Sequence, residues 1–168
     1  STQINALTAT QAKGFTSTQL KTLTTTQLSG FDTTQFGALT TSAMSGLVST
    51  NLASLTTTML NAFSSTQLGA LTTTQVASLT TTQLTNISST QLRGFNATHV
   101  GALTTTQVSG FNSTMIGDLT TTQVKGLNTT GLNTLTTTQI EGLSSSQVAA
   151  LSSTQALALT STVLGALN

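Results

Sequence analysis

Few side chains in this sequence could take part in acid–base, metal or nucleophilic chemistry. The acids are Asp32, Asp118 and Glu141, His99 is the one histidine, and there is no cysteine. General acid–base catalysis needs a positioned donor and acceptor, and a metal site needs several convergent ligands. The three acids lie far apart along the chain, so we expect them to lie far apart in the fold and not to form a carboxylate pair, and His99 has no acid close to it in sequence. We therefore predict no catalytic, cofactor-binding or metal site, and no enzymatic activity.

The sequence also argues against several common classes of binding partner. The four cations, Lys13, Lys21, Arg93 and Lys125, are too dispersed to form the basic stripe of a nucleic-acid-binding protein. No apolar run approaches the roughly 20 residues that a membrane-spanning helix requires. Serine and threonine abound, but none has a plausible base beside it that would activate it toward a small-molecule substrate.

The dominant feature is instead an eight-residue repeat. Every eighth residue from Leu7 to Leu167 is Leu, Phe or Ile, which divides the chain into 21 octads. We label the octad positions a to h, as in Leu103-Thr-Thr-Thr-Gln-Val-Ser-Gly110. Positions a and f are apolar, b to d are mostly Thr or Ser, e is Gln in 14 octads, g varies and h is small. Lys, Arg and Glu occur only at g, which predicts that g faces solvent.

Alternate octads differ, which gives a second period of sixteen residues. Phenylalanine at position a is confined to one set of alternate octads, at Phe15, Phe31, Phe63, Phe95 and Phe111. Glycine at position h is confined to the other set, at Gly14, Gly30, Gly46, Gly94, Gly110, Gly126 and Gly142. The structural repeat is therefore a pair of unlike octads.

The composition favours a folded array over a disordered one. Hydrophobic residues make up 36% of the chain, and the net charge is only +1. Disordered segments generally lack apolar residues or have a high net charge, and this chain has neither property. We predict one continuous array over residues 1–168, without separate domains and with the phenylalanines in its core.

The octad predicts one short helix per repeat. Position b is Ser, Thr, Asn or Asp in 20 of 21 octads, with Val48 as the exception, and these are the favoured N-cap residues. Glutamine three residues later completes the capping-box pattern. Residues f and a are then three apart and share a helix face. A small residue at h would permit a close approach or a helix end with positive φ.

Other local structures fit less well. A single continuous helix would turn the apolar stripe by roughly 80° in each octad, so it would have no persistent apolar face. A strand would need a corner in every octad, because positions a and f have opposite parity. We predict an all-α, tightly wound α-solenoid with two very short helices per 16-residue repeat. The alternative is a β-solenoid with 16-residue coils, because Gly14-Phe-Thr-Ser-Thr-Gln19 resembles the coils of ice-nucleation proteins.

A second resemblance covers the whole chain. Runs such as Leu71-Thr-Thr-Thr-Gln-Val-Ala-Ser-Leu-Thr-Thr-Thr-Gln-Leu84 resemble the Thr/Gln-rich repeat regions of large bacterial secreted or surface proteins of the adhesin-like type. The resemblance implies an extracellular or cell-surface location and a role as a spacer, stalk or filament. The chain begins and ends in mid-octad, so we expect it to be a stretch of a longer array.

Two functional hypotheses follow from the repeat. The first is a structural filament or stalk subunit, stabilised by the stacking of identical repeats and assembling with itself end to end. The alternative is a binding surface in which rows of threonine contact ice, a polysaccharide or another periodic target. A less specific role is also open to the threonines at position d, namely hydrogen bonding to backbone groups between coils, and we give this role the greater weight.

Overall fold

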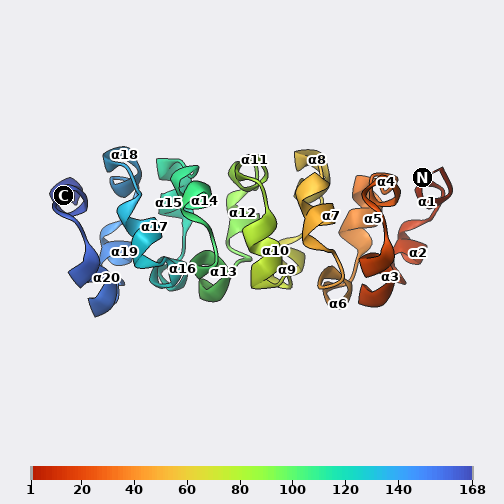
Figure 1. Ribbon diagram of the computed structural model, residues 1–168, viewed down its shortest axis with the longest axis horizontal. Coiled ribbons are helices and arrows are strands. Elements are labelled where there is room, and N and C mark those ends of the chain that lie inside the picture. Colours follow the sequence, from red (N-terminus) through yellow and green to blue (C-terminus); the bar gives the residue numbers. More distant parts are fainter. Residues whose placement is uncertain (1, 168) are drawn as a thin grey trace. The chain divides into compact units, whose positions relative to one another are not determined.

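The computed structural model describes residues 2–167, and all the regular structure in this range is α-helical (Figure 1). Each octad contributes one helix of four to six residues. The predicted α-solenoid is confirmed, and the absence of any strand in residues 2–167 argues against the β-solenoid. The chain ends and the predicted cap at Asn168 lie outside the described residues.

The chain forms two compact units, Ser1–Gly94 and Phe95–Asn168, and each is described by itself. The helices of the first unit are α1 (Thr2–Asn5), α2 (Ala9–Lys13), α3 (Ser17–Thr22), α4 (Thr25–Leu28), α5 (Thr33–Ala38), α6 (Thr41–Met44), α7 (Ser49–Ser54), α8 (Thr57–Asn61), α9 (Ser65–Gly69), α10 (Thr73–Ser78), α11 (Thr81–Thr85) and α12 (Ser89–Leu92). Those of the second are α13 (Ala97–Gly101), α14 (Thr105–Ser109), α15 (Ser113–Asp118), α16 (Thr121–Gly126), α17 (Thr129–Asn133), α18 (Thr137–Ile140), α19 (Ser145–Ala149), α20 (Ser153–Ala158) and α21 (Ser161–Ala166). The single array predicted over 1–168 stays a prediction.

Residue b caps the helices as predicted. From Thr8 to Thr160, every residue at b except Val48 accepts a hydrogen bond from the backbone N–H three residues later. Where Gln stands at e, its side chain accepts from the backbone N–H of residue b and closes the capping box, as Gln83 does with Thr80. Helices this short are not stable in isolation, so the caps must be supplemented by packing between helices.

Each helix packs against the helix three places further along the chain. In the first unit this produces the rows α2–α5–α8–α11, α3–α6–α9–α12 and α4–α7–α10 (Figure 1). The second unit has the rows α13–α16–α19, α14–α17–α20 and α15–α18–α21. Each unit is therefore a solenoid with about three octads in a turn.

The core of each unit is made of positions f and a. From Ala12 to Ile140 every residue at f is buried, and Leu68 and Val124 have no exposed surface, whereas Ala156 and Leu164 near the C-terminal end are exposed. The phenylalanines at a are nearly as well covered, except for the half-buried Phe15 in the first coil. The predicted roles of f, a and phenylalanine are confirmed. Position g is solvent-facing as predicted, since the side chains of Lys21, Arg93 and Lys125 are exposed.

Candidate functional site

Two of the ionisable residues, Asp32 and His99, take part in the capping boxes of helices. Asp32 caps α5, accepting from the backbone N–H of Gln35 at 2.8 Å. His99 lies buried at position e of α13. Within residues 2–167, no group of three or more His, Cys, Asp or Glu side chains gathers where it could hold a metal ion. In the same range, no helix is long and apolar enough to cross a membrane.

One expectation about the acids was wrong. Asp118 and Glu141 were expected to lie far apart, but both line one open groove of about 470 Å³, together with Ser113, Thr114, Gly117, Thr138 and Gly142. The reason is the packing of α15 against α18, which places residues more than twenty positions apart in sequence on adjacent helices. Sequence distance was misleading because the length of one turn was not known.

The glutamines at position e have a second role that was not predicted. Gln83 is 3% exposed, and its Oε1 accepts from the backbone N–H of Thr80 at 2.8 Å. Its Nε2 donates to the carbonyl oxygens of Leu52 at 3.0 Å and Leu55 at 2.7 Å, in the previous turn. One side chain thus caps its own helix and joins two turns of the solenoid.

The same arrangement recurs through both units. Gln67 donates to the carbonyls of Phe36 and Leu39, and Gln147 donates to those of Ile116 and Leu119. The carbonyl at position a accepts no backbone N–H in these turns, so glutamine provides its hydrogen bond. A buried carbonyl without a partner is costly. We call this series of bonds from glutamines at position e to the previous turn the glutamine ladder, and it directly stabilises the stacking of successive turns.

The threonines at position d do not have the role to which we gave the greater weight. Every Thr or Ser at d from Thr10 to Thr162 is exposed. None of these hydroxyls bonds to a backbone group of another turn in residues 2–167, because Gln at position e already fills that role. In each unit, the residues at position d are therefore exposed to solvent.

Small residues allow the turns to approach closely. Gly94, which follows α12, packs on the first residue of α9, and a Cβ atom at Gly94 would lie 2.1 Å from the carbonyl oxygen of Ser65. Gly126 packs on Ala97 and Gly142 packs on Ser113 in the same way. No described glycine has positive φ. Of the two roles proposed for glycine at h, the close approach is therefore correct.

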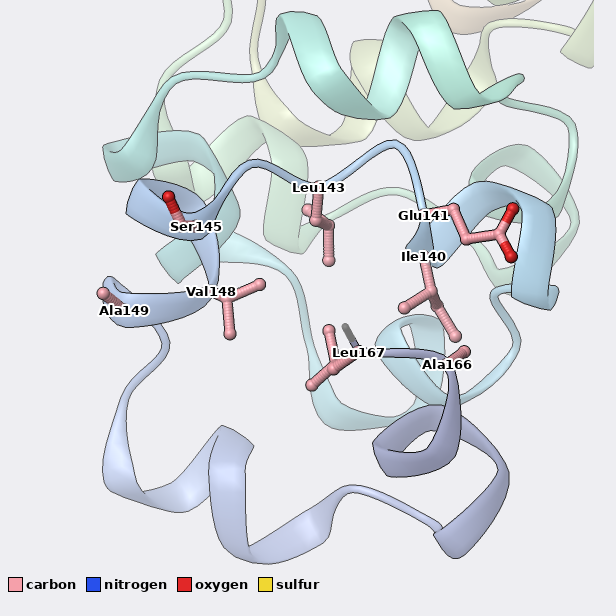
Figure 2. A pocket seen from close by; sticks show the side chains of 8 residues that line it. All are labelled: Ile140, Glu141, Leu143, Ser145, Val148, Ala149, Ala166 and Leu167. Atoms are coloured by element: carbon pink, nitrogen blue, oxygen red, sulfur yellow. The ribbon is translucent and has the colours of Figure 1, made fainter.

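An apolar hollow of about 330 Å³ lies among α18, α19 and the end of α21. Figure 2 shows Ile140, Leu143, Val148 and Leu167 facing this space, while the carboxylate of Glu141 points away from it. Ile140, Leu143 and Val148 occupy the f and a positions that form the core of other turns. Leu143 and Val148 are only half-buried, so the hollow is a part of the core that is incompletely covered. Glu141 and Ser145 are the polar residues in its lining.

Comparison with known proteins gives one partial match. A family model described as the ALTTAQ repeat matches residues 44–81. These residues run from the end of α6 to the start of α11 and include the glutamine ladder at Gln67 and Gln75. The match supports a Thr/Gln-rich tandem repeat. No curated protein matches the chain.

The glutamine ladder can be tested with a single substitution. In Gln83→Glu, one carboxylate oxygen still accepts from Thr80, but the donor to Leu52 and Leu55 becomes an acceptor facing two carbonyls. Burying that unpartnered charge should lower the free energy of unfolding by about 3 kcal/mol. Urea denaturation at pH 7 measures the change.

Gln19→Glu is the matched control. Gln19 forms the same capping box with Thr16 but is exposed, and within residues 2–167 its side chain bonds only to Thr16. A carboxylate in the first turn of a helix is mildly favourable, so we expect a change within about 0.5 kcal/mol. Equal losses in the two variants would show that the contact between turns contributes nothing beyond the cap.

Proposed function

We propose that this chain is a structural repeat protein outside the cell, acting as a filament or stalk subunit that stacks end to end with further copies of itself. The main support is the glutamine ladder, because the contact between successive turns is the same at Gln67, Gln83 and Gln147. An interface that repeats at every turn can be extended by any further turn of the same sequence. The resemblance to adhesin-like repeat regions suggests the cell-surface setting.

The first and last turns present complementary polar groups. Gln11, Gln19 and Gln27 are exposed, and each uses Oε1 for its own capping box while its Nε2 makes no bond to another turn. Within residues 2–167, the glutamines of the last turns, Gln147 and Gln155, donate to earlier carbonyls and not to those of Leu143 and Leu151. Donors in one surface thus match acceptors in the other, and the incompletely covered core beside Leu143 supplies apolar area for the same contact.

Sedimentation velocity over a concentration series tests the assembly. We expect the mass to grow with concentration in multiples of the 17.1 kDa chain. The double variant Gln19→Glu/Gln27→Glu should remain monomeric at the same concentrations, because it places carboxylates opposite the carbonyls of the partner copy.

Lys21→Glu is the control, because it also changes the net charge by −2 but lies at position g of α3, away from the proposed donors. This variant should assemble like the parent chain. A constant mass for the parent chain, or equal loss of assembly in both variants, would contradict stacking through the glutamines.

The exposed position d favours a second candidate function, a periodic binding surface. Within the row α4–α7–α10, the hydroxyls of Thr26, Thr50 and Thr74 are all exposed. A row of equivalent groups suits a periodic target such as ice or a polysaccharide. Thermal hysteresis that disappears when these three residues are changed to Lys would support this function, and its absence from the parent chain would remove ice as the target.

A further inference from the structure

An apolar contact between positions a and f joins successive turns. In the first unit the ring of Phe63, at a, meets the ring of Phe36, at f, edge to face, with the centroids 5.5 Å apart. In the second unit Leu167, at a, and Ile140, at f, face the same hollow (Figure 2). In both pairs the residue at a follows the residue at f by 27 positions. This spacing tells which apolar residues of successive turns meet.

The first turn has three residues at position a without such a partner. Leu7, Phe15 and Leu23 are only half-buried, whereas every residue at a from Phe31 to Leu135 is buried. Within residues 2–167, no residue at f precedes any of these three by 27 positions. They therefore form an apolar surface on the first unit whose usual cover is missing.

The last turn has three residues at position f that lack the matching cover. Val148 is half-buried, and Ala156 and Leu164 are exposed, with 53% of Leu164 accessible to solvent. In the described part of the chain, no residue at a follows any of them by 27 positions. The hollow of about 330 Å³ lies beside Val148 on the same surface of the second unit. Three residues at f thus await the kind of residue that the first turn leaves uncovered.

We propose that the first unit of one copy docks on the second unit of another copy in one register, with α1, α2 and α3 over α19, α20 and α21. This inference rests on the proposed function, to which it adds the register of the contact. The register continues the packing of each helix on the helix three places earlier. Both sets of unmatched residues repeat every eight positions, so a second copy that forms one pair forms all three. The pairs are Leu7 with Val148, Phe15 with Ala156, and Leu23 with Leu164.

The sizes of the side chains support this register. Position f is alanine only at Ala12 and Ala156, and elsewhere it is a larger apolar residue. The proposed register places Phe15, the largest of the three unmatched residues at a, opposite Ala156. A shift by one helix would place Phe15 against Val148 or Leu164 instead, where a larger side chain already fills the space. The order of sizes therefore favours one register of the three.

The contacts made by glutamine and glycine inside the chain also continue in this register. With α2 over α20, Gln11 reaches the carbonyl of Leu151, which has the same place in the repeat as the carbonyl that Gln83 reaches in its own chain. Gly14 follows α2 and lies over Ser153, the first residue of α20. Within the chain, glycine after a helix packs on the first residue of the helix beneath it in the same way.

Exchanging two side chains tests the pairing of Phe15 with Ala156. In Ala156→Phe two phenylalanines would meet between copies, so the mass from sedimentation velocity should stay at 17.1 kDa at concentrations where the parent chain assembles. The double variant Phe15→Ala/Ala156→Phe again has one phenylalanine and one alanine at each contact, and it should regain the growth in mass. Growth of Ala156→Phe like that of the parent, or no recovery in a double variant with the parent's circular dichroism, would overturn the pairing.

Engineered cysteines test the register without changing the core, because the chain has no cysteine. A residue at g lies against the backbone of the residue at h that comes 25 positions later, since a Cβ atom at Gly37 would lie 3.3 Å from the carbonyl oxygen of Ala62. In the proposed register Ala149 of one copy faces Ala6 of the next in this way, and both residues are exposed. On oxidation, Ala6→Cys/Ala149→Cys should form a ladder of disulfide-linked multimers on non-reducing gels.

Ala6→Cys/Leu157→Cys is the matched control. Leu157 is also exposed at position g, but it lies one helix further along, in α20. This pair should give no ladder. A ladder from the control pair, or no ladder from either pair while the parent chain grows in mass, would overturn the register and leave the proposed function standing. A parent chain of constant mass would contradict the proposed function itself.

Discussion

Gly126→Ala is expected to lower the free energy of unfolding by about 3 kcal/mol, at the upper end of the usual cost of overpacking. A Cβ atom at this position would lie 2.2 Å from the carbonyl oxygen of Ala97 and 2.7 Å from its Cα. These are backbone atoms, so no side chain can rotate away, and α16 would have to move off α13. Urea denaturation of the parent and variant chains gives the change.

Gly165→Ala is a control that should change stability in the opposite direction. Gly165 also lies in a helix, α21, but a Cβ atom there would meet nothing within 4 Å. Alanine loses less conformational entropy than glycine on entering a helix, so this variant should gain roughly 0.5–1 kcal/mol. If both alanines prove stabilising, glycine at position h has no role in the approach of successive turns.

Phe36→Ala should be the most damaging single truncation of the core, with a loss of about 3–5 kcal/mol. The side chain of Phe36 has no exposed surface. Its ring contacts those of Phe31 and Phe63, at centroid distances of 5.4 and 5.5 Å. Because these rings come from different turns, the cavity would remove contacts on both sides of α5. The urea midpoint of the first unit measures this loss.

Leu157→Ala is the control for Phe36→Ala, because it truncates a large apolar side chain that is not buried. Leu157 is a large apolar residue, but 88% of its side chain is exposed, so its truncation should change stability by less than about 0.5 kcal/mol. A loss comparable to that of Phe36→Ala would mean that Leu157 is covered in solution, for example by another copy of the chain.

The local structure of each repeat could be predicted because its causes lie within eight residues. An N-cap at b, a partner at e and apolar residues at f and a determine where a helix begins and which face it buries. The one helix in α2–α21 without a side-chain cap could also be predicted, because its N-cap residue, Val48, has no side-chain oxygen. Exposure at position g followed from the charges found there.

The contacts between turns could not be predicted, because they depend on how many octads complete a turn. That number depends on the change in chain direction between one helix and the next, and the segments between helices have similar sequences in every octad. Without it, neither the second role of glutamine nor the shared groove of Asp118 and Glu141 could be derived. The exposure of position d also depends on it, since glutamine reaches the carbonyls of the previous turn instead.

The 16-residue period shows most clearly what the sequence determines and what only the tertiary structure determines. The sequence alone determined that two kinds of octad alternate, one with glycine at h and one with phenylalanine at a. Only the structure showed that packed helices are three octads apart, which is an odd number, so unlike octads always meet. Gly94 therefore packs on the octad of Phe63, and Gly126 packs on that of Phe95. The alternation matters because a backbone approach this close needs a glycine on one side and a small residue, Ser65 or Ala97, on the other.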